Sequence, residues 1–122
     1  MVLKHWLLVF VGGGIGSLFR YGLAVWMAAY QDRFPWGTFF ANVVSCVLLG
    51  ALIGLSTKNE VSADLRLSLM TGLCGGFSTF STFAGETLQL AQQGRWEGAL
   101  LNIGLNLAIC LFCIYLGMKL VA

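Results

Sequence analysis

The sequence predicts an all-α integral membrane protein that forms one domain over residues 1–122, with four transmembrane helices of which the third is broken in mid-span. Of the 122 residues, 58% are hydrophobic and only 10% are charged, whereas a soluble domain carries roughly 25% charged residues. The chain has one proline and sixteen glycines, which suits long helices packed closely through small residues. We therefore expect a multi-pass protein surrounded by lipid.

Four apolar segments are long enough to cross a bilayer, which takes ~20 helical residues. They run over about residues 6–30, 36–57, 65–90 and 96–121, and their ends carry Trp6, Tyr30, Trp36 and Trp96. Amphipathic aromatic side chains of this kind favour the membrane interface. The links, residues 31–33, 58–64 and 92–95, are short and hold half of the charged residues. The basic residues form no run, so we expect no nucleic-acid partner.

The charge pattern specifies orientation only weakly. Four spans place on one side Lys4, Lys58, Arg66 and Lys119, and on the other side Arg33 and Arg95. Lysine and arginine favour the cytoplasmic side, and this split is a small bias. A single topology and insertion in both orientations are therefore both open on this evidence.

The third segment holds the most informative stretch of the chain. Residues 72–83 read Gly-Leu-Cys-Gly-Gly-Phe-Ser-Thr-Phe-Ser-Thr-Phe. Glycine costs about 1 kcal/mol relative to alanine in a helix, and Ser and Thr compete for backbone hydrogen bonds, so we expect a break here. Within a membrane a break is tolerated only where it is buried in protein or lines a watery cavity. The segment is therefore either a packing seam or a site for a small polar solute.

The break would offer ligands to ions of either sign. Phe80 and Phe83 fall on roughly one helix face, and the electropositive edges of their rings suit an anion. The backbone amides of a restarting helix also favour anions, whereas carbonyls released by the break favour a cation. Packing between helices is the other explanation for the two phenylalanines.

Polar stripes on the second and fourth segments have the same two explanations. An asparagine in lipid needs hydrogen-bond partners, so such stripes either join helices or line a wet path. Helical spacing places on one face of the second segment Thr38, Asn42, Ser45 and Cys46, and on one face of the fourth Asn102, Asn106, Cys110 and Cys113. We interpret the cysteines as small buried apolar residues rather than as metal ligands or disulfides.

Glycine spacing predicts close packing of helices. Pairs four residues apart occur at Gly12 and Gly16, at Gly50 and Gly54, and at Gly72 and Gly76. Such pairs let helix backbones approach one another, within a protomer or across a dimer.

Two ionisable residues lie well inside predicted spans, Arg20 in the first and Glu86 in the third. A charged residue at a helix centre costs about 2.5–3.5 kcal/mol on insertion scales and is a functional hypothesis by default. The alternative is a structural role, in which Arg20 reaches the interface or pairs with Glu86.

The order of these features resembles that of a known family. Gly13, Gly14, Gly16, Arg20 and Tyr21 are followed by Pro35, Gly37, Thr38 and Asn42, then by the run from Gly72 to Phe83, and then by Glu86. Over nearly the whole chain this pattern resembles the Fluc fluoride ion channel family, also called the CrcB camphor-resistance proteins. The run in the third segment is the highly specific part. The chain differs at Ser45, where the family often has glycine, and at Asn102 and Asn106, where other members have tyrosine, serine or histidine.

The resemblance implies an antiparallel, dual-topology homodimer of four-helix protomers in the inner membrane of a bacterium. It also implies two fluoride pores, bordered at one end by Glu86 and with Arg20 near a vestibule. The implied pore residues are Phe80, Phe83, Asn42, Ser81, Thr82 and Asn106. A structural Na⁺ at the dimer centre would be held by the backbone carbonyls of Gly75 and Ser78.

We therefore expect passive, selective fluoride export and no enzyme activity. The first alternative is a small proton-coupled exporter similar to the small multidrug resistance proteins, with Glu86 as the proton-binding carboxylate. The second is a non-transporting assembly or scaffold subunit, which would show no flux by itself.

Overall fold

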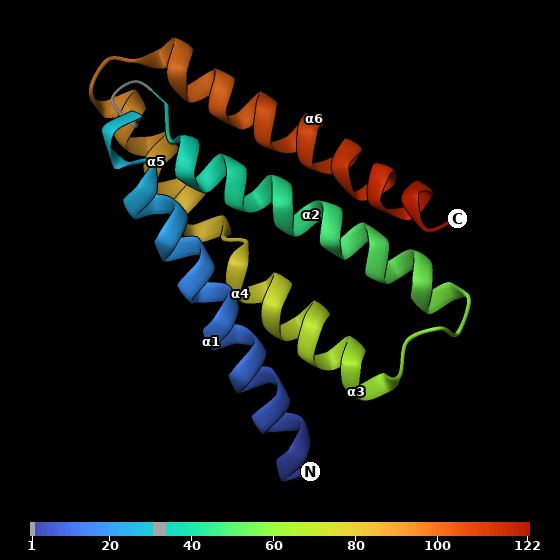
Figure 1. Ribbon diagram of the computed structural model, residues 1–122. Helices are drawn as coiled ribbons and strands as arrows, with labels where there is room; N and C mark the ends of the chain where they lie inside the picture. The colour runs from blue at the N-terminus through green and yellow to red at the C-terminus, as the bar shows by residue number, and fades with distance from the viewer. Residues whose placement is uncertain (1, 31–33) are drawn as a thin grey trace.

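The computed structural model describes residues 2–30 and 34–122, and the regular elements of this part of the chain are all helical (Figure 1). The predicted first link, residues 31–33, and with it the Arg33 of the charge count, lies outside the described residues. The elements are α1 (Leu3–Trp26), the 3-10 helix η1 (Ala28–Tyr30), α2 (Trp36–Thr57), α3 (Ala63–Arg66), the π-helix η2 (Leu67–Cys74), α4 (Gly75–Phe77), α5 (Phe80–Gln92) and α6 (Trp96–Leu120).

Among the described residues, three helices are long and apolar enough to cross a membrane, namely α1, α2 and α6. They correspond to the first, second and fourth predicted segments. The first differs most from its prediction, because α1 starts earlier, at Leu3, and ends at Trp26 before the separate 3-10 turn to Tyr30. The chain is thus a helical protein suited to a membrane.

The third predicted segment consists of several helical pieces between Ala63 and Gln92. Its start precedes the predicted one, because the Ser62 hydroxyl accepts a hydrogen bond from the Leu65 N–H at 3.1 Å and so caps α3. Helices α3, η2 and α4 follow one another directly, and Figure 1 shows the chain leaving α4 and restarting as α5 after a short step. A π-helical stretch such as η2 is rare and often accompanies a functional site.

Helices α2 and α6 form the most extensive helix pair and run side by side (Figure 1). A Cβ atom on Gly50 would overlap the carbonyl oxygen of Ile114, and one on Gly117 would overlap that of Val47. The two backbones therefore touch where glycine removes the side chain. This contact brings the polar stripes of the second and fourth segments together.

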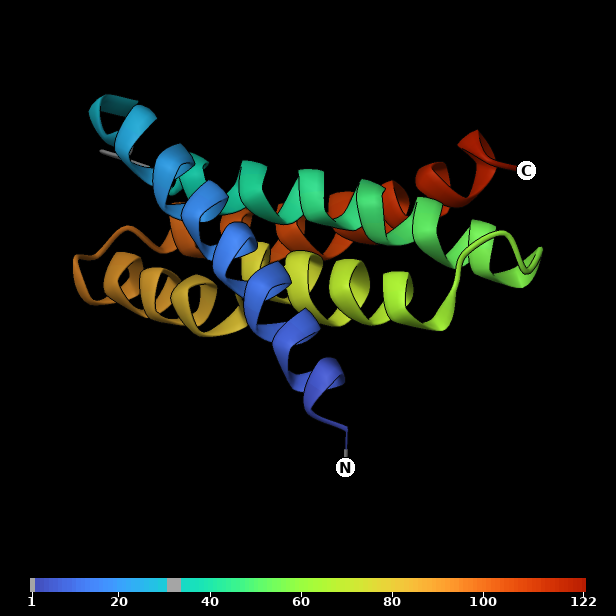
Figure 2. The same ribbon diagram turned by 60° about the horizontal axis from the view of Figure 1, so that its bottom comes forward.

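Helix α1 crosses the others obliquely (Figure 2) and packs mainly against η2 and α4. A Cβ atom on Gly16 would overlap the carbonyl oxygen of Leu73, and one on Gly76 would overlap that of Gly13. The predicted role of the small residues in close packing is thereby confirmed. The opposite face of α1 exposes large apolar side chains such as Phe10 and Leu18, as a lipid-facing helix does.

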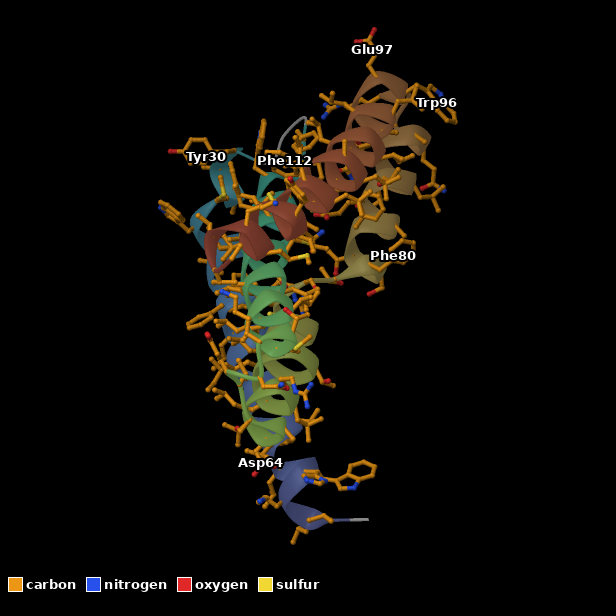
Figure 3. All side chains as sticks on the ribbon, turned by 90° about the vertical axis from the view of Figure 1, so that its right-hand side faces the viewer. Tyr30, Asp64, Phe80, Trp96, Glu97 and Phe112 are labelled. Carbon is orange, nitrogen blue, oxygen red and sulfur yellow. The ribbon has the colours of Figure 1, made fainter. Side chains whose placement is uncertain are left out.

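Polar contacts join chain segments at one end of the molecule. Lys4 Nζ lies 2.8 Å from Asp64 Oδ2, and His5 Nε2 lies 3.7 Å from Asp64 Oδ1. The hydrogen bond from Lys4 holds the pKa of the exposed Asp64 carboxyl below its usual value. Asp64 and Glu97, which stand before and after the broken segment, lie at opposite ends of the molecule (Figure 3).

Candidate functional site

Ser78 and Thr79 interrupt the third segment. Ser78 has a ψ of 156°, and Thr79 has φ −152° and ψ 125°, so both residues are extended between α4 and α5. Thr79 then caps the restarting helix, since its Oγ1 accepts a hydrogen bond from the Thr82 N–H at 3.2 Å. The predicted break within residues 72–83 is confirmed.

Side chains form hydrogen bonds with the backbone at the break. The Thr79 N–H donates to Asn42 Oδ1 of α2 at 3.0 Å. The carbonyl of Cys74 keeps its helical donor, the Ser78 N–H at 2.9 Å, and it also accepts from Ser78 Oγ at 2.8 Å and from Ser45 Oγ at 3.0 Å. Because backbone groups at membrane depth must be satisfied within the protein, these contacts stabilise the extended step. Ser45, which differs from the family pattern, thus has a structural role beside the break.

The break also takes the usual helical donor away from two carbonyls. In a continuous α-helix the Gly75 carbonyl accepts from the Thr79 N–H, and the Ser78 carbonyl accepts from the Thr82 N–H. Here the Thr79 N–H donates to Asn42, and the Thr82 N–H donates to the Thr79 hydroxyl. The carbonyl oxygens of Gly75 and Ser78, which are predicted to hold sodium, have thus lost their helical N–H partners, and carbonyl oxygens of this kind are suitable ligands for a cation.

The carboxamides of α2 and α6 form a chain of hydrogen bonds next to the break. Asn42 Nδ2 donates to Asn106 Oδ1 at 3.0 Å. Asn106 Nδ2 donates to Asn102 Oδ1 at 2.8 Å, and Asn102 Nδ2 donates to Thr87 Oγ1 at 2.8 Å. Asn102 and Asn106 are buried. The polar stripes thus join α2 to α6, which is the first of the two explanations predicted from the sequence.

An open groove of about 230 Å³ lies at the break, between α2, α5 and α6. The rings of Phe80 and Phe83 lie side by side there, with centroids 5.7 Å apart and planes tilted by 56°. Phe83 is buried, whereas Phe80 is 76% exposed and stands on the outer side of the chain at the start of α5 (Figure 3). The groove is lined by Asn42, Cys46, Ser78, Thr79, Phe80, Phe83, Asn106, Leu107 and Cys110.

The groove therefore brings together several of the predicted site residues and leaves others outside its lining. Asn42, Phe80, Phe83 and Asn106 line it, and so does Ser78. The exposed Ser81 and the half-buried Thr82 lie beside it on α5. The Thr79 hydroxyl is 3.4 Å from that of Ser81 and 3.2 Å from that of Thr82, so all three hydroxyls cluster where α5 begins.

Glu86 lies further along α5, outside the groove lining. It is half-buried, and its carboxylate has the Thr38 hydroxyl of α2 as a hydrogen-bonding neighbour. Its Oε1 is buried and lacks a hydrogen-bond partner within residues 2–30 and 34–122. Glu86 thus keeps unused acceptor capacity beside α2.

Arg20 acts on the opposite side of the broken segment. Its Nε donates to the Gly76 carbonyl at 3.2 Å. Within this protomer Arg20 thus bonds the Gly76 carbonyl of α4, whereas Glu86 lies on α5 beside Thr38 of α2. Arg20 satisfies a carbonyl close to the break.

One residue of this arrangement is absent from the sequence prediction. Thr87 Oγ1 accepts from Asn102 and donates to the Phe83 carbonyl at 2.7 Å. The available signal was its position four residues after Phe83, on the same face of α5. A threonine at such a position commonly bonds the carbonyl one turn earlier.

The fold and the site define a helical membrane protein with a mainly apolar groove at a broken helix, into which a few amide and hydroxyl side chains are set. Polar groups at a broken membrane helix are typical of proteins that move small ions. Across the described residues there is no group of three or more His, Cys, Asp or Glu side chains that could hold a metal. The chain belongs to the family described as CrcB-like protein, Camphor Resistance (CrcB), whose model matches residues 7–118. The resemblance drawn from the sequence is thereby confirmed.

Relatives of this chain match it over nearly its whole length. The "Fluoride-specific ion channel FluC" of Shewanella sp. (strain ANA-3) is 42% identical over 120 residues, which cover 98% of this chain and 97% of that protein. The protein of the same name from Shewanella sp. (strain W3-18-1) is 43% identical over 116 residues, 94% of each chain. That from Shewanella loihica is 42% identical over 120 residues.

Proposed function

We propose that this protein is a fluoride-selective ion channel that lets fluoride leave the cell passively and so lowers its cytoplasmic concentration. The observation that carries this function is the groove at the broken helix, where hydrogen-bond donors and aromatic edges meet in a chain whose relatives are named fluoride-specific channels. Family membership favours a channel over the proton-coupled exporter that would use Glu86, and over an enzyme or a scaffold.

The membrane potential supplies the driving force for export. With the interior about 100 mV negative, moving one anion outward yields about 2.3 kcal/mol. This free energy supports roughly a fifty-fold difference in fluoride concentration at steady state. A channel therefore suffices, and the inner membrane of a bacterium is the location we propose for it.

In this proposal different groove residues contact an anion that has lost part of its water shell. The Asn42 carboxamide offers an N–H, and the rings of Phe80 and Phe83 offer electropositive edges. The hydroxyls of Ser81 and Thr82 continue the path along α5. We place Glu86 at one end of the path and Arg20 near a vestibule.

Efflux from liposomes tests this function directly. Purified protein is reconstituted with internal fluoride, and release is followed with a fluoride electrode and then repeated with chloride. We expect rapid release of fluoride and no release of chloride above that of empty liposomes, because a narrow path with fixed donors selects by size and hydration. Equal release of both ions, or no release from folded protein, would contradict the proposal.

We propose that the broken third segment is a fourth membrane span and that two chains assemble as an antiparallel, dual-topology homodimer. The positions of Asp64 and Glu97 at opposite ends of the molecule support the span (Figure 3). The open groove and the exposed Phe80 support a second copy that covers them. An impermeant thiol reagent should label Ala122→Cys from both sides of the membrane, and labelling from one side alone would exclude dual topology.

We further propose that a structural Na⁺ lies between the two protomers, held by the carbonyls of Gly75 and Ser78 from each chain. Support comes from the diversion of their helical donors to Asn42 and Thr79. A bound ion would neutralise the carbonyl dipoles that the break exposes. Two carbonyls from one chain make half of a four-oxygen set, so the site needs the dimer.

Removal of sodium tests this assignment. Replacing Na⁺ by N-methylglucamine should lower the thermal stability of the dimer, since saturation at 100 times the dissociation constant is worth about 2.7 kcal/mol. Restoring Na⁺ should recover the stability, whereas an equal concentration of K⁺ should not. A melting temperature that is the same in all three salts would contradict a sodium site.

A further inference from the structure

We propose that Asn102, which does not line the groove, is a positioning residue that fixes the orientation of the Asn42 carboxamide through Asn106. In this arrangement Asn106 serves as an orienting acceptor and not as a ligand of the anion. The inference rests on the proposed function and adds to it the device that aims the donor at fluoride. It also changes the role expected of Asn106, which the family resemblance places among the pore ligands.

At one end of the carboxamide chain, a backbone donor fixes the orientation of the first carboxamide. The Thr79 N–H can only donate, so the atom of Asn42 that faces it at 3.0 Å must be the oxygen. The nitrogen of Asn42 then faces Asn106, where it donates to Oδ1 at 3.0 Å. The extended backbone at the break therefore requires the oxygen of Asn42, and not its nitrogen, to face Thr79.

At the other end of the carboxamide chain, a backbone acceptor independently fixes the orientation of Asn106. The Asn102 carbonyl can only accept, so the atom of Asn106 that faces it at 2.9 Å must be the nitrogen. The same nitrogen lies 2.8 Å from Asn102 Oδ1. Both ends require the oxygen of Asn106 to face Asn42, so the whole chain of hydrogen bonds has a single direction.

Burial and a second-helix contact hold Asn102 itself in place. Its side chain is only 1% exposed, and its Nδ2 donates to Thr87 Oγ1 at 2.8 Å. The Thr87 hydroxyl in turn donates to the Phe83 carbonyl at 2.7 Å. The chain thus starts at the N–H of Thr79 and returns to α5 two turns later, so it ties the carboxamides to both the break and the aromatic pair.

The hydrogens of these carboxamides are directed differently. Both acceptors of the Asn106 nitrogen belong to Asn102, so Asn106 turns its oxygen toward Asn42 and its hydrogens away from the groove. The Asn42 nitrogen carries two hydrogens, and its bond to Asn106 uses one. The second hydrogen of Asn42, a residue that lines the groove, is the one we assign to the anion.

A double-mutant cycle tests whether Asn102 acts through Asn42. Asn102→Leu should lower fluoride efflux from reconstituted dimers about tenfold, the effect expected from loss of one orienting hydrogen bond. Asn42→Ser removes the carboxamide but keeps a hydroxyl, so that measurable flux remains. Because the two residues act in series, the double variant should conduct no less than Asn42→Ser alone. If the double variant lost as much efflux as the losses of the two single variants combined, Asn102 would have only a structural role.

Two further variants separate orientation from stability. Ser45→Ala removes a buried hydrogen bond to the break that is not part of the carboxamide chain. It should lower the thermal stability about as much as Asn102→Leu does, but leave efflux and the fluoride-to-chloride ratio unchanged. Thr87→Val is isosteric and removes the hydroxyl that accepts from Asn102, together with its bond to the Phe83 carbonyl, so it should reduce efflux by a few fold even if Asn102→Leu fails to fold. Equal effects of Ser45→Ala and Thr87→Val on fluoride efflux would overturn the inference.

The outcomes also separate this inference from the proposed function. A protein that releases no fluoride in its unaltered form refutes the function itself. A protein that conducts fluoride but loses flux additively in the cycle refutes only the positioning role of Asn102.

Discussion

Replacing both Phe80 and Phe83 by isoleucine should reduce fluoride efflux by on the order of 100-fold, the loss typical when preorganised electrostatic stabilisation is removed from a buried charge. Isoleucine keeps the two positions apolar but has no electropositive edge to face an anion. The ring pair, with its centroids 5.7 Å apart, is the aromatic part of the groove. Efflux from reconstituted dimers, normalised to protein content, is the measurement.

Phe112→Ile is the matched control for this double substitution. Phe112 is an exposed phenylalanine of α6 that lies outside the groove lining, so its replacement should leave efflux unchanged. Fluoride flux that survived the double substitution would rule out a role for the aromatic edges and leave Phe83 as a packing residue.

The substitution Asn42→Leu should abolish most of the flux and also destabilise the protein. Leucine has a similar volume but leaves the Thr79 N–H and Asn106 Oδ1 without their partner, at a cost of about 1–3 kcal/mol for each buried group. It also removes the proposed anion donor, for which we expect a loss of at least about 100-fold in efflux. Thermal unfolding in detergent and efflux from liposomes measure the two effects separately.

Ser56→Ala on the same helix is the control for the stability effect. The Ser56 hydroxyl is buried and has no hydrogen-bond partner in the part of the chain that the structure describes, so its removal should be neutral or slightly stabilising. Full stability and full flux in Asn42→Leu would show that the break does not depend on the carboxamide of α2.

The break itself could be predicted because its cause is local. Glycine at 75 and 76 weakens the helix, and the hydroxyls of Ser78 and Thr79 offer the backbone alternative partners within a few residues. A break within residues 72–83 therefore follows from the sequence, whereas its place at Ser78 and Thr79 comes from the structure. The π-helical form of η2 does not follow from the sequence either, because propensity does not distinguish it from an α-helix.

The carboxamide chain could be predicted only in part. Helical spacing placed Asn42 on one stripe and Asn106 with Asn102 on another, but spacing within a helix does not say which stripes face each other. That choice is made by the close contact of α2 with α6 at Gly50 and Gly117. The direction of these hydrogen bonds could not be predicted either, because it depends on the Thr79 N–H that the extended backbone at the break presents to Asn42.

The membrane class, the helical segments, the break and the family could be predicted from the chain alone, since each depends on composition or on residues close together along it. Two contacts required the folded structure, namely the bond from Arg20 to the Gly76 carbonyl and the bond from Asn102 to Thr87 that completes the carboxamide chain. These partners are 56 and 15 residues apart. Contacts at such separations depend on how the helices cross, and the crossing is set by which glycines let two backbones touch.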